Sequence, residues 1–216
     1  MYSLVIWDFN GTLFDDLEIG IEAVNRLLSR RGLKKIESAE EYHKVFGFPI
    51  IEYYKRLGFD FEKESYELLA KEWVKEYSSL ELTASLRPFV KELLAEIRAL
   101  GISQVILSAS EKNMLIRQVE ALGVREYFDE ILGTEDIYAY GKEEMAKRWM
   151  AKKHVESALI IGDTEHDADV AKKIGADCVL ISGGHQGVKT LEKCGVPVVS
   201  PEDAVKFIVE YIKAKG

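Results

Sequence analysis

The sequence is poor in cysteine, in long apolar runs and in excess positive charge. Its two cysteines, Cys178 and Cys194, stand far apart and lack metal-binding spacing, so we expect reduced thiols. No apolar run approaches the roughly 20 residues that span a bilayer. The formal net charge of −8 leaves no basic footprint for nucleic acid. Without a signal-peptide pattern at the N-terminus, these features predict a soluble cytoplasmic protein that binds neither membrane nor nucleic acid.

Asparagine and glutamine are also scarce, with three residues of each, whereas charged residues make up 31% of the chain. This balance favours a thermophilic source. A chain of 216 residues suffices for one domain carrying a smaller insertion. The composition leaves the oligomeric state open.

The first strand is the segment around which the chain is organised. The apolar run Ser3-Leu4-Val5-Ile6-Trp7 is followed at once by Asp8-Phe9-Asn10-Gly11-Thr12-Leu13. A short apolar run ended by a glycine turn predicts a buried strand in the centre of a parallel sheet. Asp8 then lies at the carboxyl end of that strand, where open α/β sheets bind ligands. A carboxylate so placed needs a cation or hydrogen bonds to offset its desolvation.

The next 70 residues or so show helical periodicity and no strand signal. We predict helices over 16–31, from Ser38, from Pro49 to Leu57 and over 63–80, with Asp15 and Asp16 capping the first. A segment of this length is too long for a loop and predicts an inserted helical subdomain. The predicted division is therefore a core of 1–15 and 84–216 and a helical insertion of 16–83.

The rest of the chain alternates between strands and helices. Strands are expected over 104–107, 128–132, 158–161 and 178–181, with helices over 88–100, 114–122, 142–153, 168–174 and 201–214. Such alternation predicts an α/β fold with a Rossmann-like parallel sheet covered by helices on both faces.

Polar residues lie at the ends of three of these elements, in a recognisable order. Ser108-Ala109-Ser110 follows one strand, Lys142 follows Gly141 at a helix start, and Gly162-Asp163-Thr164-Glu165-His166-Asp167 follows another strand. Together with Asp8-Phe9-Asn10-Gly11-Thr12-Leu13, they resemble the four motifs of the haloacid dehalogenase-like (HAD) superfamily. The motifs span most of the chain outside the helical insertion, which the resemblance places as a cap over the active site.

The resemblance implies a role for each motif residue. Asp8 would be the nucleophile that forms an aspartyl-phosphate, and Lys142 would hold nucleophile and phosphoryl group together. Ser108 would bind a phosphoryl oxygen, and Ala109 and Thr12 are further expected phosphate contacts. Mg²⁺ would be held by Asp8, Asp163 and the carbonyl of Asn10, with Asp167 binding it directly or through another ligand. The implied function is a Mg²⁺-dependent phosphatase acting on a small phosphorylated metabolite.

Asn10 departs from the family pattern, which has at this position a second aspartate that serves as general acid/base. An amide can neither protonate a leaving group nor deprotonate water, so we expect weakened turnover, improved for alkyl phosphates by Asn10→Asp. The departure also keeps open a non-catalytic, phospholigand-binding or regulatory protein. A 2-haloacid dehalogenase is a further alternative, although the pair Asp163 and Asp167 favours the metal enzyme. A phosphonatase would need a cap lysine that the residues after Gly47 do not provide.

Three histidines have open roles. His43 in the insertion is the candidate to replace the missing acid. His166 lies inside the fourth motif, and His185 lies in a glycine-rich loop where it could orient an aspartate or face solvent. Tyr53 and Tyr54 are expected to pack inside the insertion rather than to touch substrate.

Overall fold

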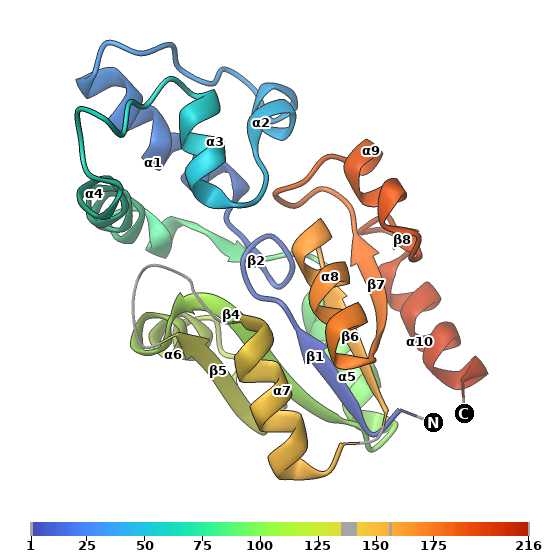
Figure 1. Cartoon of the computed structure of the whole chain (residues 1–216). Coiled ribbons are helices and arrows are strands. Elements are labelled where there is room, and N and C mark those ends of the chain that lie inside the picture. Colours follow the sequence, from blue (N-terminus) through green and yellow to red (C-terminus); the bar gives the residue numbers. More distant parts are fainter. Residues whose placement is uncertain (1, 135–141, 156, 216) are drawn as a thin grey trace.

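The computed structural model describes residues 2–134, 142–155 and 157–215, drawn in colour in Figure 1. At its centre lies a six-stranded sheet in the order β5-β4-β1-β6-β7-β8, in which every neighbouring pair is parallel. The strands are β1 (Leu4–Trp7), β4 (Ser103–Glu111), β5 (Glu130–Thr134), β6 (Ala158–Gly162), β7 (Asp177–Ile181) and β8 (Val198–Val199). The predicted α/β class is confirmed.

Strand β1 lies between β4 and β6, and all four of its residues are buried. Because successive side chains of a strand point to opposite faces, Val5 and Trp7 enter one apolar cluster and Leu4 and Ile6 another. Helices α5 (Val90–Ala99), α6 (Lys112–Ala121) and α10 (Ala204–Ala214) pack in the first cluster, and α7 (Lys142–Lys153), α8 (Glu165–Ile174) and α9 (Val188–Leu191) in the second. The sheet is therefore covered on both faces, as the alternating pattern predicts.

Residues 16–83, which we call the cap, form four helices above the carboxyl ends of the strands (Figure 1). They are α1 (Leu17–Arg30), α2 (Ala39–Val45), α3 (Ile50–Arg56) and α4 (Tyr66–Ser78). Their apolar faces meet in a third cluster that includes Leu28, Tyr53 and Tyr54, so the two tyrosines pack as expected. The two connections to the sheet pair as a short antiparallel ribbon, β2 (Phe14–Asp15) with β3 (Ser85–Leu86). A two-residue strand carries no periodicity, and the sequence did not predict this ribbon.

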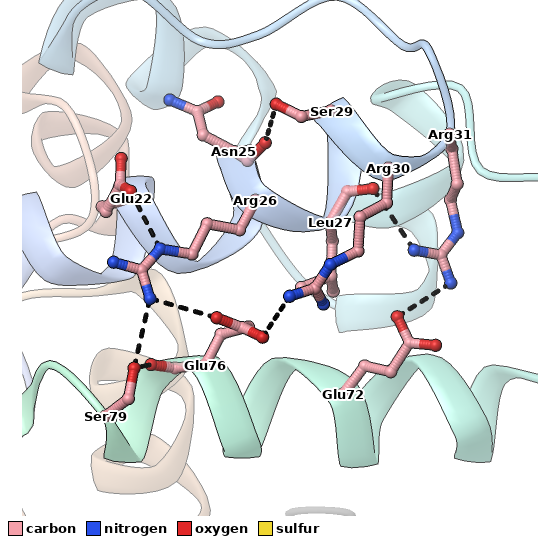
Figure 2. Close-up of polar contacts among 10 residues, drawn as sticks. All are labelled: Glu22, Asn25, Arg26, Leu27, Ser29, Arg30, Arg31, Glu72, Glu76 and Ser79. Atoms are coloured by element: carbon pink, nitrogen blue, oxygen red, sulfur yellow. Dashed lines mark hydrogen bonds and ion pairs between the residues drawn. The ribbon is translucent and has the colours of Figure 1, made fainter.

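Ion pairs join α1 to α4 within the cap (Figure 2). The carboxylate of Glu76 accepts from Arg26 at 3.1 Å and from Arg30 at 2.5 Å. Arg31, directly after α1, pairs with Glu72 of α4 at 3.1 Å and with Glu64, which precedes α4, at 2.6 Å. These contacts connect the polar sides of the two helices, whose apolar sides are already buried in the third cluster.

Several boundaries differ from the sequence prediction. Helix α8 begins at Glu165 rather than at residue 168, because Thr164 and Asp167 form a capping box at its start. Strand β4 continues to Glu111, although its pairing with β5 becomes irregular after Leu107. The short elements α9 and β8 were not predicted. Gly141 of the third motif lies outside the described residues.

Candidate active site

The carboxyl ends of adjacent strands bring the predicted residues together. Asp8 directly follows β1, and Asp163 directly follows β6, its neighbour in the sheet. Lys142 is the first residue of α7 and is 5% exposed. Ser108 lies on β4, on the other side of β1, and is also buried. Parallel strands end at one edge of the sheet, so residues distant in sequence converge there.

Lys142 forms the central contact of the site. Its ammonium donates to Oδ1 of Asp8 at 2.7 Å and to Oδ1 of Asp167 at 2.6 Å. Oxygen atoms of Asp8, Asp163 and Asp167 all lie within 4.8 Å of one another. Three buried carboxylates are thus gathered around an ammonium that contacts two of them.

Asp163 is fixed from two directions. Its Oδ1 accepts from the hydroxyl of Thr12 at 2.8 Å, and its Oδ2 accepts from the backbone N–H of His185 at 2.6 Å. Gly11, at φ +72°, lies so close that a Cβ there would stand 2.3 Å from Asp163 Oδ2. The backbone therefore approaches this carboxylate as only glycine allows.

Asp167 has its second oxygen fully engaged at the start of α8. Oδ2 accepts from the hydroxyl of Thr164 at 2.7 Å and from its backbone N–H at 3.1 Å. With Oδ1 on Lys142, the Asp167 side chain is held as a link between the helix start and the lysine.

The titration behaviour of the three carboxyls follows from this arrangement. Burial raises the pKa of Asp8, the charges of Asp167 and Asp163 raise it further, and Lys142 opposes them only in part. Burial also raises the pKa of Asp163, with Asp167 adding to the effect. For Asp167 burial is outweighed by Lys142, and its pKa is lowered. Asp8 and Asp163 thus lack sufficient positive charge, and oxygen-rich, under-neutralised sites of this kind fit a hard divalent cation.

The expected phosphate contacts have the following surroundings. Ser108 Oγ accepts from the backbone N–H of Ser110 at 3.1 Å, and the carbonyl of Ala109 accepts from the hydroxyl of Thr134 at 3.1 Å. The hydroxyl of Thr12 is directed at Asp163, so in this structure it orients a carboxylate. Phosphate binding by Ser108, Ala109 and Thr12 stays a prediction.

Asp16 is the functional candidate that sequence reasoning missed. It stands at the N-cap position of α1, but its side chain makes no capping hydrogen bond. It is instead buried and accepts from the backbone N–H of Gly11 at 2.7 Å and from Nδ2 of Asn10 at 2.7 Å. Burial opposes its ionisation, but His185 and the hydrogen bonds from Tyr77 and Asn10 prevail and lower its pKa. Asp16 directly follows β2 and precedes a helix, and the local sequence gave no signal for this role.

The histidines belong to contacts between the cap and the sheet domain. His185 Nε2 lies 3.1 Å from Asp16 Oδ1, and its Nδ1 lies 2.9 Å from the hydroxyl of Tyr42 in α2. His43 directs Nε2 to the carbonyl of Gly184 at 2.8 Å, and it does not contact Asp8 in this structure. His166 packs on the ring of Phe48, with ring centroids 4.9 Å apart. His185 therefore both orients Asp163, through its backbone, and joins the cap to the core, through its ring.

Arg87 is a second residue that the sequence did not single out. It is 4% exposed and donates to the carbonyl of Gly11 at 2.8 Å and to that of Ser182 at 2.5 Å. It thereby ties the turn after β1 to the loop after β7. Both segments approach Asp163, so Arg87 braces the loops that shape the site.

Comparison with known proteins agrees with this geometry. A family model described as haloacid dehalogenase-like hydrolase matches residues 5–181. The chain belongs to this family. The assignment as a hydrolase made from the four motifs is thereby confirmed. The match spans all four motif segments and the cap.

The individual relatives have low sequence identity to this chain, but the similarity extends over most of its length. PpaX of Caldanaerobacter subterraneus subsp. tengcongensis, whose name describes a pyrophosphatase, is 25% identical over 184 residues, which are 83% of this chain and 81% of that protein. Tyrosine-protein kinase PtkA of Mycobacterium tuberculosis is 25% identical over 202 residues, 92% of this chain and 68% of PtkA.

Solved structures show the same fold. A haloacid dehalogenase-like family protein of Streptococcus pneumoniae superposes with a TM-score of 0.81 at 19% identity, over 96% of this chain and 98% of that one. The structure of M. tuberculosis PtkA superposes with a TM-score of 0.80 at 23% identity, over 96% of this chain and 98% of that one.

Among the described helices, none combines the length and the apolar character that a membrane-spanning helix needs.

Proposed function

We propose that this protein is a Mg²⁺-dependent phosphatase that hydrolyses a small phosphorylated metabolite through an aspartyl-phosphate on Asp8. The observation that carries the proposal is the buried contact of Lys142 with both Asp8 and Asp167 beside the under-neutralised Asp163. The names of relatives support it. They include PpaX and phosphoglycolate phosphatases of Yersinia pseudotuberculosis and Vibrio parahaemolyticus, which are 22% and 28% identical over 84% and 42% of this chain.

Asp8, Asp163 and the backbone carbonyl of Asn10 would hold the ion, with Asp167 beside them. When bound, Mg²⁺ would neutralise charge that develops on the phosphoryl oxygens. This role fits a site in which burial and mutual repulsion raise the pKa of Asp8 and Asp163. The same neutralisation would keep Asp8 ionised and nucleophilic at neutral pH.

In the first step, a carboxylate oxygen of Asp8 would attack phosphorus and the bond to the leaving-group oxygen would break. Lys142 would orient Asp8 through its 2.7 Å contact and offset negative charge on the transferred group. Ser108 would donate its hydroxyl to a phosphoryl oxygen.

In the second step, water would attack phosphorus, and the bond to Asp8 would break to release phosphate. The proton lost by water needs an acceptor, and Asn10 cannot serve as one. We therefore expect slow hydrolysis of the aspartyl-phosphate and its accumulation during turnover.

A second candidate is phosphoryl transfer from Asp8 to an acceptor other than water. Asn10 favours it, because a long-lived aspartyl-phosphate leaves time for another nucleophile. The relationship to PtkA, named as a tyrosine-protein kinase, points in the same direction. In this case the enzyme would release little free phosphate, and a supplied acceptor would become phosphorylated instead.

The test is release of phosphate from p-nitrophenyl phosphate and from a panel of phosphorylated metabolites, with Mg²⁺ or with a chelator. We expect Mg²⁺-dependent release by the wild type and none by Asp8→Asn. Asp169→Asn, an exposed carboxylate on α8, is the matched control and should retain activity. A phospholigand-binding protein would release nothing, and a 2-haloacid dehalogenase would act on 2-chloropropionate without metal.

A further inference from the structure

The side chains of Asn10 and Asp16 face one another at the junction of core and cap. Asn10 Nδ2 donates to Asp16 Oδ2 at 2.7 Å and to the hydroxyl of Tyr77 at 2.8 Å. On its other side, Asn10 Oδ1 accepts from the hydroxyl of Ser110 at 2.8 Å. An ionised carboxylate can only accept, so the nitrogen of the amide must be the atom that faces Asp16.

Asp16 is in turn surrounded by donors. Besides Asn10, it accepts from the backbone N–H of Gly11 and from the hydroxyl of Tyr77, each at 2.7 Å. The ring of His185 completes the set at 3.1 Å. The side chain is 2% exposed, so water does not share in these contacts. The surroundings are complementary to a single negative charge.

We propose that Asp16 is a positioning residue that requires an amide at position 10, so that positions 10 and 16 together carry one carboxylate. This rests on the proposed function, because position 10 is where the acid/base of the reaction would stand. A second carboxylate at position 10 would lie about as close to Asp16 as the amide nitrogen does now, at 2.7 Å. The donor that now faces Asp16 would be replaced by an acceptor, and two carboxylate oxygens cannot form a hydrogen bond with each other.

The pairing predicts that Asn10→Asp alone gains little activity toward alkyl phosphates. In the single variant the new carboxylate would have no donor toward Asp16, so its side chain would not keep the orientation that the amide of Asn10 has now. The missing acid/base would then not be restored by the single substitution. The carboxylate at position 16 has to be removed as well.

Exchanging the two residues preserves the hydrogen bonds of the pair and reverses the direction only of those among position 10, position 16 and Tyr77. In the double variant Asn10→Asp/Asp16→Asn, the oxygen of the new amide can keep the bonds from Gly11 and His185. Its nitrogen can donate to the new carboxylate and to Tyr77, whose hydroxyl can rotate to donate to position 10. Ser110 can donate to position 10 as before. The exchange therefore moves the charge to position 10 without leaving a polar atom of the pair unpartnered.

The experiment compares wild type, Asn10→Asp, Asp16→Asn and the double variant with Mg²⁺ present. The substrates are β-glycerophosphate, whose leaving oxygen is basic, and p-nitrophenyl phosphate, whose leaving group departs unprotonated. We expect the double variant to raise kcat for β-glycerophosphate about 100-fold, and Asn10→Asp alone less than about 10-fold. First-turnover release of p-nitrophenolate should change little. A purely structural effect of the substitutions would instead alter the reaction of both substrates. Asn10→Asp combined with Asp15→Asn, the exposed neighbour, is the control and should match Asn10→Asp alone.

An equal gain for Asn10→Asp with and without Asp16→Asn would overturn the proposal, because the two positions would then not be coupled. If no protein of the set releases p-nitrophenolate, the proposed function fails instead. In that case the melting temperatures of the variants still test whether Asp16 and Asn10 depend on each other. Each single variant should lower the Tm and the double variant should regain most of the loss, whereas additive losses would refute the pairing.

Discussion

The ammonium of Lys142 lies 2.7 Å from Oδ1 of Asp8, although 134 residues separate the two in sequence. The contact joins the start of α7 to the end of β1 and is buried. Breaking a buried ion pair by removing one partner typically costs about 3–5 kcal/mol, because a charge is left uncompensated. The lysine is therefore expected to matter for both folding and chemistry.

Lys142→Met should abolish phosphate release and lower the free energy of unfolding by about 3 kcal/mol. Urea denaturation in the presence of a chelator measures the second effect without the metal. Lys147→Met is the control, since Lys147 forms an exposed pair with Glu143 one turn along the same helix. Its unfolding free energy should change much less, because exposed ion pairs contribute little to stability. Similar decreases in unfolding free energy for the two variants would argue against a stabilising buried contact of Lys142 with Asp8 and Asp167.

Asp163→Asn should weaken Mg²⁺ binding and catalytic activity together. The amide removes one negative charge from the cluster while the contact of Thr12 with this side chain can persist. Titration calorimetry with Mg²⁺ alone measures the affinity, with the exposed Asp169→Asn as the control. Unchanged affinity in Asp163→Asn would remove this residue from the set of metal ligands.

The pair of Asp16 and His185 predicts a specific dependence of stability on pH. Burial lowers the pKa of His185, but the Asp16 carboxylate prevails and raises it to about 9. A histidine with a raised pKa binds its proton more tightly in the folded state. Its contribution is therefore complete below pH about 6.5, the ordinary value, and is lost as the pH rises through about 9.

His185→Gln should accordingly destabilise the protein at pH 6 and much less at pH 10. The difference should approach about 3 kcal/mol. Denaturant titrations across this range, with a chelator present, measure it. A destabilisation that stays constant with pH would mean that His185 carries no charge in the folded protein.

The ion pairs between α1 and α4 predict an effect confined to the cap. Glu76→Gln removes the charge that pairs with both Arg26 and Arg30 and should lower the Tm (Figure 2). Glu22→Gln breaks only an exposed pair with Arg26 and is the control, with a smaller expected change. Hydrogen exchange should show faster exchange in α1 and α4 of Glu76→Gln, and unaltered exchange there would contradict the assignment.

Much of the core and the positions of the motif residues could be predicted because they depend on local patterns. The apolar run of β1 and the glycine turn after it place Asp8, and the strand before Gly162 places Asp163 in the same way. Lys142 was predicted as the first residue of its helix, and α7 begins there. Parallel strands end at one edge, so local assignments sufficed to bring these residues together.

The role of Asp16 could not be predicted for the opposite reason. Locally an aspartate before a helix is a capping residue, and that was the prediction. Its actual partners, Tyr77 and His185, come from α4 and from the loop after β7, and only tertiary packing brings them to it. The bonds of Arg87 to Gly11 and Ser182 were missed for the same reason.

The most direct test of the account is detection of a phosphoryl group on Asp8. Wild-type protein would be mixed with Mg²⁺ and p-nitrophenyl phosphate, quenched in acid, digested and analysed by mass spectrometry. We predict that the peptide containing Asp8 gains one phosphoryl group that hydroxylamine removes, and that Asp8→Asn gains none. Phosphate release by a wild-type protein that never carries this modification would contradict the proposed mechanism.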